Sequence, residues 1–92
     1  MISALDDVIV LDVRTQPEFQ RMRISGAVLI PHTEITNRAE AELPDKNAVI
    51  LVYCQSGRRS ALASESLARL GYTSIYDFGG INSWPFEVVG DN

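Results

Sequence analysis

Four runs of apolar or β-prone residues divide the chain and predict four strands. They cover residues 8–13, 27–30, 48–53 and 73–78. The first three runs are almost continuously apolar, which is typical of strands in a sheet that is covered on both faces. The run at 48–53, with the sequence AVILVY, is the most apolar, so we place it at the centre of the sheet.

Helical signals fill the stretches between these runs. Thr15 is placed as an N-cap, with Pro17 in the first turn and Glu18 as its capping-box partner, and this short helix is expected to end near Met22. Two longer helices are predicted from apolar residues spaced three or four apart, which form one stripe on each helix. The stripes are Ile35, Ala39 and Leu43 in one helix and Ala63, Leu67 and Leu70 in the other, which Gly71 ends.

The last part of the chain has weaker signals. The glycine pair at 79–80 predicts a tight turn, residues 81–84 a single turn of helix, and the tail from Pro85 an irregular segment. Alternating strands and helices predict an α/β fold with a mainly parallel sheet and right-handed crossovers. Binding sites in such sheets form beyond the carboxyl ends of the strands, where Arg14, Cys54 and the glycine pair all fall.

Length and charge limit the kind of molecule this is. The 92 residues, 46% of them apolar, predict one globular domain over residues 1–92 with a core at about 8–85. A net charge of −4 argues against binding to nucleic acid, and no run approaches the roughly 20 apolar residues of a membrane span. We favour a cytoplasmic location because residues 1–7 lack the features of a signal peptide, although a periplasmic one stays open if a signal peptide has been removed.

The single cysteine stands between the central strand and the third helix, in the segment 53–60, YCQSGRRS. Backbone N–H groups at a helix start are unpaired and attract anions, so the Cys54 thiol is expected to ionise more readily than a free cysteine. Gly57 allows the loop to turn these N–H groups inward. The expected backbone donors are Gln55, Ser56, Arg58 and Arg59.

The loop CQSGRRS resembles the active-site loop of rhodanese-like sulfurtransferases, whose common form is Cys-x-x-Gly-x-Arg-Ser. Three further segments are similar to that family in the same order. They are 11–14 (LDVR) with Glu18 and Phe19, 25–31 (from SGA to IP) and 79–84 (GGINSW). The resemblance covers about residues 8–85 and implies a three-layer sandwich, with a sheet of four to five strands and helices on both faces. The family usually has a further strand and helix before the first strand seen here.

The resemblance also implies a reaction. Cys54 would act as a nucleophile and take a sulfane sulfur from a donor such as thiosulfate, which forms a persulfide that a second nucleophile discharges. That acceptor would be cyanide or a thiol, with a protein acceptor allowed, and no metal or organic cofactor is implied. The substrate-binding residues would be Gln55, Ser56, Gly57, Arg58, Arg59 and Ser60. Ser60 is also expected to be the N-cap of the third helix, with its hydroxyl either capping alone or also donating to the thiolate.

Charged residues near the loop are given supporting roles. We expect Arg58 to face the substrate and Arg59 to turn back to the scaffold, because Arg59 abuts the helix start. Asp12 and Arg14 are placed on opposite sides of their strand. Arg14 is then expected to pair with Glu18. Asp12, Arg14 and Glu18 are all expected to support the site rather than to contact the substrate.

Three other interpretations use the same residues. A cysteine-dependent phosphatase or arsenate reductase also holds an anion in a loop, but its pattern resembles Cys, five residues and Arg, and here Ser60 stands at the sixth position after Cys54. A non-catalytic binding module of the same fold often lacks the cysteine that this chain has. A general redox thiol would need a second cysteine to resolve it. We therefore favour the sulfurtransferase.

Overall fold

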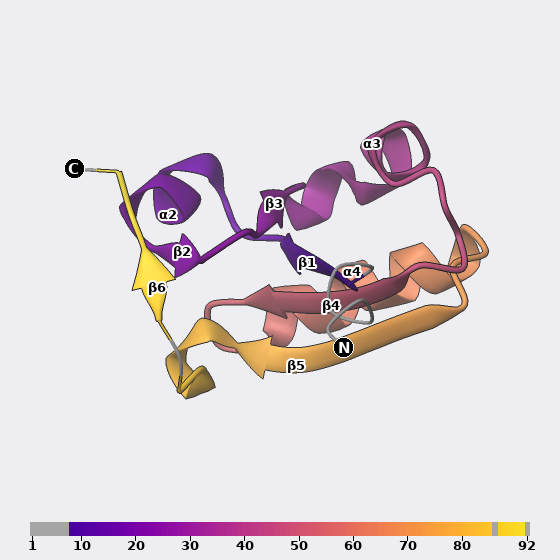
Figure 1. The fold of residues 1–92 in the computed structure, drawn as a ribbon. Helices are drawn as coiled ribbons and strands as arrows, with labels where there is room; N and C mark the ends of the chain where they lie inside the picture. The colour runs from indigo at the N-terminus through magenta and orange to yellow at the C-terminus, as the bar shows by residue number, and fades with distance from the viewer. Residues whose placement is uncertain (1–7, 86, 92) are drawn as a thin grey trace.

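The computed structural model describes residues 8–85 and 87–91 of the chain. Strands and helices alternate along most of this length, as the sequence predicts (Figure 1). The strands are β1 (Val8–Asp12), β2 (Arg23–Ile24), β3 (Val28–Leu29), β4 (Val49–Cys54), β5 (Ser74–Gly80) and β6 (Val88–Val89). The helices are α2 (Gln16–Arg21), α3 (Ile35–Glu42) and α4 (Arg58–Arg69), with 3-10 turns η1 (His32–Glu34) and η2 (Ile81–Ser83).

The main sheet has four parallel strands in the order β3-β1-β4-β5. This confirms the prediction of a mainly parallel α/β sheet, and β4 lies inside it as its apolar sequence indicates. A separate antiparallel pair, β2 with β6, lies beyond one end of the sheet (Figure 1). This pair was not predicted from the sequence, and the tail from Pro85, predicted to be irregular, supplies β6.

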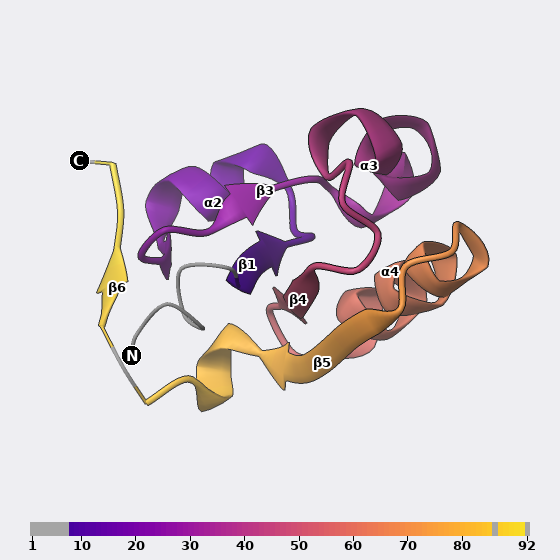
Figure 2. The same ribbon diagram turned by 45° about the vertical axis from the view of Figure 1, so that its right-hand side comes forward.

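Side chains of β4 alternate between two apolar clusters on the two faces of the sheet. Ile50, Val52 and Cys54 belong to the larger cluster, which the buried stripes of α3 and α4 complete. Figure 2 shows both helices on the same side of the sheet. Tyr53 faces the other way, where its ring stacks on Phe78 at 5.5 Å between centroids. Cys54, the candidate nucleophile, therefore lies on the face that α3 and α4 cover, and Tyr53 beside it lies on the opposite face.

The ends of two helices form as the local sequence predicts. Thr15 caps α2 in a full capping box, in which its side chain accepts from the backbone N–H of Glu18 and the Glu18 carboxylate accepts from the N–H of Thr15. Gly71 follows the last turn of α4 with a φ of +101°, the left-handed conformation that a C′ residue needs.

Among the described residues, no helix is both long enough and apolar enough to cross a lipid bilayer.

The glycine pair at 79–80 is not the tight turn that the sequence analysis predicts. Both residues belong to β5, and a bulge in that strand shifts the register so that Val52 lies opposite Asp77 but Tyr53 lies opposite Gly79. Gly79 takes a φ of +94°, which a bulge residue with a side chain would adopt only with strain. The glycines therefore redirect the end of the strand rather than reverse the chain.

Candidate active site

The candidate site lies at the carboxyl ends of three neighbouring strands. Asp12, Cys54 and Gly80 are the last residues of β1, β4 and β5, and Cys54 lies directly opposite Gly80 in the strand register. Sites in parallel sheets form at this edge because the loops that leave adjacent strands meet there. The structure thus brings together the segments that the sequence analysis expected to converge.

Cys54 is almost fully buried, and its sulfur accepts a hydrogen bond from the backbone N–H of Gly57 at 3.0 Å. Burial raises the pKa of the Cys54 thiol. The nearby N–H and hydroxyl of Ser60 and the N–H groups of Gly57 and Ser56 lower it, and together they leave the pKa below its ordinary value. Of the donors expected from the sequence, Ser56 has this role. The N–H groups of Gly57 and Ser60 are additions.

Two glycines let the loop close around the sulfur. Gly57 has a φ of +112°, which turns the chain inward at the start of α4. Gly80 lies against the loop so closely that a Cβ there would overlap the carbonyl oxygen of Gln55. The tight packing of β5 on the loop therefore requires glycine at position 80.

The prediction that Ser60 caps α4 is wrong. The helix begins at Arg58, and its N-cap is Gly57, whose left-handed backbone allows the helix to start three residues earlier than a serine cap would. Ser60 is instead fully buried in the first turn. Its hydroxyl donates to oxygen atoms of the surrounding chain, nearest to Asp77 Oδ1 at 2.7 Å.

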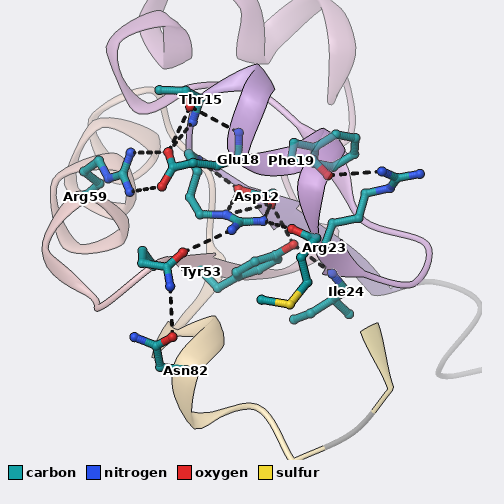
Figure 3. Close-up of polar contacts among 12 residues, drawn as sticks. Asp12, Thr15, Glu18, Phe19, Arg23, Ile24, Tyr53, Arg59 and Asn82 are labelled. Atoms are coloured by element: carbon teal, nitrogen blue, oxygen red, sulfur yellow. Dashed lines mark hydrogen bonds and ion pairs between the residues drawn. The ribbon is translucent and has the colours of Figure 1, made fainter. Parts of the chain in front are cut away.

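The pairing predicted between Arg14 and Glu18 is also wrong. Glu18 instead forms two parallel bonds with Arg59, at 2.8 and 2.9 Å (Figure 3). The hydrogen bonds from Arg59 lower the pKa of Glu18 to about 2, and bonds from Thr15 add to this effect. This bidentate pair ties the start of α2 to the start of α4, so Arg59 turns back to the scaffold as expected.

Arg14 pairs with Asp12, which corrects the placement of these residues on opposite sides of the strand. Residues two apart on an extended chain share a face. Both side chains are buried, and the Arg14 Nη2 to Asp12 Oδ2 distance is 2.7 Å. Tyr53 completes the network, because its hydroxyl donates to Asp12 Oδ2 and accepts from the N–H of Ile24 (Figure 3). Burial raises the pKa of the Tyr53 hydroxyl, so it remains a donor.

The Gln55 side chain joins this network to the far side of the loop. Arg14 donates to Gln55 Oε1 at 3.2 Å, and Gln55 Nε2 donates to Asn82 Oδ1 at 2.9 Å. Asn82 stands on η2, and sequence reasoning gave it no role. Arg58, by contrast, is exposed, and its side chain forms no hydrogen bond or ion pair with the described residues. Of the two loop arginines, only Arg59 is therefore held by a carboxylate.

Comparison with known proteins bears on what this site is. The family model for the rhodanese-like domain matches residues 1–86. The chain belongs to the rhodanese-like family. The thiosulfate sulfurtransferase PspE of Escherichia coli is 39% identical over 71 residues, which are 77% of this chain and 68% of PspE. A sulfurtransferase of Allochromatium vinosum is 35% identical over 80 residues, 86% of this chain and 73% of the relative.

Solved rhodanese structures agree with the fold. A rhodanese from E. coli, whose structure was determined with anions, superposes with a TM-score of 0.85 at 35% identity, covering 90% of this chain and 98% of the other. The chain is thus a transferase of the rhodanese-like sulfurtransferase family. Cys54, with the loop around it, occupies the motif that the sequence analysis assigned to that family.

Proposed function

We propose that this rhodanese-like protein moves a sulfane sulfur from a donor such as thiosulfate to a thiophilic acceptor through a persulfide on Cys54. The observation that carries this proposal is the Cys54 sulfur, which is buried at the end of β4, accepts the N–H of Gly57 at 3.0 Å and has a lowered thiol pKa. A thiolate held in this way is a nucleophile without a separate base.

In the first step, the Cys54 thiolate attacks the outer sulfur of thiosulfate. A bond forms between Sγ and that sulfur, while the bond to the sulfite sulfur breaks and its electron pair leaves with sulfite. The inward N–H groups of Ser56, Gly57 and Ser60 stabilise the negative charge on the sulfur chain. Arg58, free at the loop surface, attracts the donor dianion, and the remaining loop residues Gln55 and Arg59 hold the cradle in shape.

In the second step, the acceptor attacks the terminal sulfur of the persulfide. The new bond forms to the acceptor, the bond to Sγ breaks, and its electron pair returns to the Cys54 thiolate. A cellular thiol, on a small molecule or a protein, fits this chemistry, and cyanide serves as a laboratory acceptor. Asp12, Arg14 and Glu18 act as supports: Asp12 and Arg14 brace the end of β1, and Glu18 braces α4.

The experiment is a thiocyanate assay with thiosulfate and cyanide, run on the wild type and Cys54→Ser. The serine swap is nearly isosteric and keeps a polar atom in the cradle, so we expect transfer to be abolished while the melting temperature stays close to the wild-type value. Transfer retained by Cys54→Ser would remove Cys54 from the nucleophile role. Aryl phosphate hydrolysis by the wild type, lost on Cys54→Ser, would instead favour the phosphatase interpretation.

A further inference from the structure

Asn82 is a polar residue beside the Cys54 loop to which the mechanism above gives no role. It is exposed on η2, the turn that directly follows β5 (Figure 3). The turn itself is anchored: Ile81 is buried with Tyr53 in the cluster on the sheet face opposite Cys54. The backbone N–H of Trp84 closes the turn by donating to the Ile81 carbonyl at 3.0 Å. Asn82 therefore projects from a fixed support.

Arg14 is held so that one of its nitrogens is left for Gln55. Its Nε and Nη2 donate to the Asp12 carboxylate, and Nη2 also donates to the carbonyl oxygen of Met22. The remaining nitrogen, Nη1, donates to Gln55 Oε1 at 3.2 Å. A guanidinium has donors only, so the Gln55 amide must turn its oxygen toward Arg14 and its nitrogen away from it.

This orientation of Gln55 decides what Asn82 must present. Gln55 Nε2 donates to Asn82 Oδ1 at 2.9 Å (Figure 3). If Asn82 presented its amide nitrogen instead, two donors would face each other without an acceptor. The Gln55 amide is thus bonded at both ends, to Arg14 beyond the end of β1 and to Asn82 on η2.

Gln55 connects these two contacts to the nucleophile. It directly follows Cys54, and its carbonyl oxygen packs against Gly80, which lies opposite Cys54 in the strand register. Two residues further on, the N–H of Gly57 donates to the Cys54 sulfur at 3.0 Å. A side chain bonded at both ends restricts the backbone of the first loop residue and so helps to keep this N–H on the sulfur. A donor that is already in place needs no reorganisation during the reaction.

We propose that Asn82 is a positioning residue for sulfur transfer: with Arg14 it clamps the Gln55 side chain, and this clamp holds the Cys54 loop in its reactive conformation. The proposal rests on Cys54 being the nucleophile of the proposed function. The contact between Gln55 and Asn82 is open to solvent, so water replaces it at little cost to the stability of the whole fold. Loss of Asn82 should therefore affect the loop more than the fold.

The first experiment is the thiocyanate assay on Asn82→Ala, which removes the acceptor for Gln55. We expect kcat to fall roughly three- to tenfold, the worth of one hydrogen bond, because the catalytic geometry is disturbed. The KM for thiosulfate and the melting temperature should stay close to the wild-type values. Ser83→Ala is the matched control, since Ser83 is the exposed neighbour on η2 and its side chain forms no hydrogen bond with the described residues. An unchanged kcat in Asn82→Ala overturns the proposal.

A change of polarity tests the contact itself. Asn82→Asp keeps an oxygen toward Gln55 Nε2, so kcat at saturating thiosulfate should stay within about twofold of the wild type, and repulsion of the donor by the new charge should appear in KM. Gln55→Glu turns an oxygen toward Asn82, whose amide can rotate to donate to it. The combined variant sets two carboxylates against each other, and its kcat should lie well below the product of the two single effects. Effects that simply multiply overturn the pairing.

Amide hydrogen exchange tests the loop without any sulfur donor. In Asn82→Ala, the N–H of Gly57 should exchange roughly three- to tenfold faster, while the N–H groups inside β4 keep their wild-type rates. Faster exchange throughout the protein with a lower melting temperature would show a general structural role, and it overturns the proposal, as does unchanged exchange at Gly57. If the wild type transferred no sulfur, faster exchange at Gly57 alone would still support the clamp, and only the proposed function would fail.

Discussion

The two arginines of the loop differ in their partners. We expect this difference to distinguish an arginine that binds substrate from one that supports the loop. Arg59 is fixed by two bonds to Glu18, whereas Arg58 projects from the loop without a partner among the described residues. An arginine presents a planar fork of donors that suits a small dianion. Adjacent residues of one type therefore have different surroundings, and different kinetic constants should report on them.

We expect Arg58→Ala to raise KM for thiosulfate with the melting temperature unchanged, and Arg59→Ala to lower the melting temperature and kcat together. Loss of a ground-state contact appears in KM, while a disturbed catalytic geometry appears in kcat. The measurements are steady-state kinetics and thermal melting of both variants. Arg69→Ala, at the exposed far end of the same helix, is the control. Purely KM effects of equal size from both loop variants would show that neither arginine braces the loop.

At the scale of elements, the pair Glu18–Arg59 joins two helices whose starts are both anchored locally. The capping box fixes Glu18 on α2, and its carboxylate then receives Arg59 from α4. The folded-state pKa of Glu18, about 2, lies below its ordinary value of 4.5. The stabilisation from this carboxylate is therefore complete above pH 4.5 and is lost as the pH falls toward 2.

Glu18→Gln should accordingly lower the free energy of unfolding at neutral pH by about 1–2 kcal/mol, because it removes a charge-assisted pair. The difference from the wild type should narrow between pH 4.5 and 2, as the wild-type carboxylate becomes protonated. Urea unfolding of both proteins across this pH range measures this difference in the free energy of unfolding. Glu65→Gln is the control, since its pair with Arg69 is largely exposed and is expected to contribute little. A difference in the free energy of unfolding that stays constant down to pH 2 would contradict a stabilising role of the Glu18 carboxylate.

Elements with a local signal could be predicted from the sequence. The capping box of Thr15 and Glu18 lies within four residues, and it forms as expected. The two-residue strands β2 and β6 have no periodicity to detect, and Arg23 and Val89, which pair there, are far apart in the chain. The partners of Glu18 and Ser60 were missed for the same reason. Arg59 and Asp77 come close to them only through the packing of the sheet and helices.

In the molecule as a whole, the two faces of the sheet carry different groups. The face that α3 and α4 cover presents Cys54 and its donors, while the opposite face carries the buried network of Asp12, Arg14 and Tyr53. Gln55 reaches from the loop to Arg14 and so connects the two. Strand alternation alone places Cys54 and Tyr53 on opposite faces, so this division was available from the sequence. The hydrogen bonds of the network could not be predicted from the sequence, because they depend on contacts between β1, β2 and β4.

We expect the transferred sulfur to pass through Cys54, and the intact mass of the protein reports on this step. After treatment with thiosulfate, the wild type should gain the mass of one sulfur atom, and Cys54→Ser should gain none. Cyanide should then remove the added mass and release thiocyanate, because it attacks the terminal sulfur of the persulfide. Thiocyanate formation by a wild-type protein whose mass never changes, or an equal gain of sulfur by Cys54→Ser, would contradict the account.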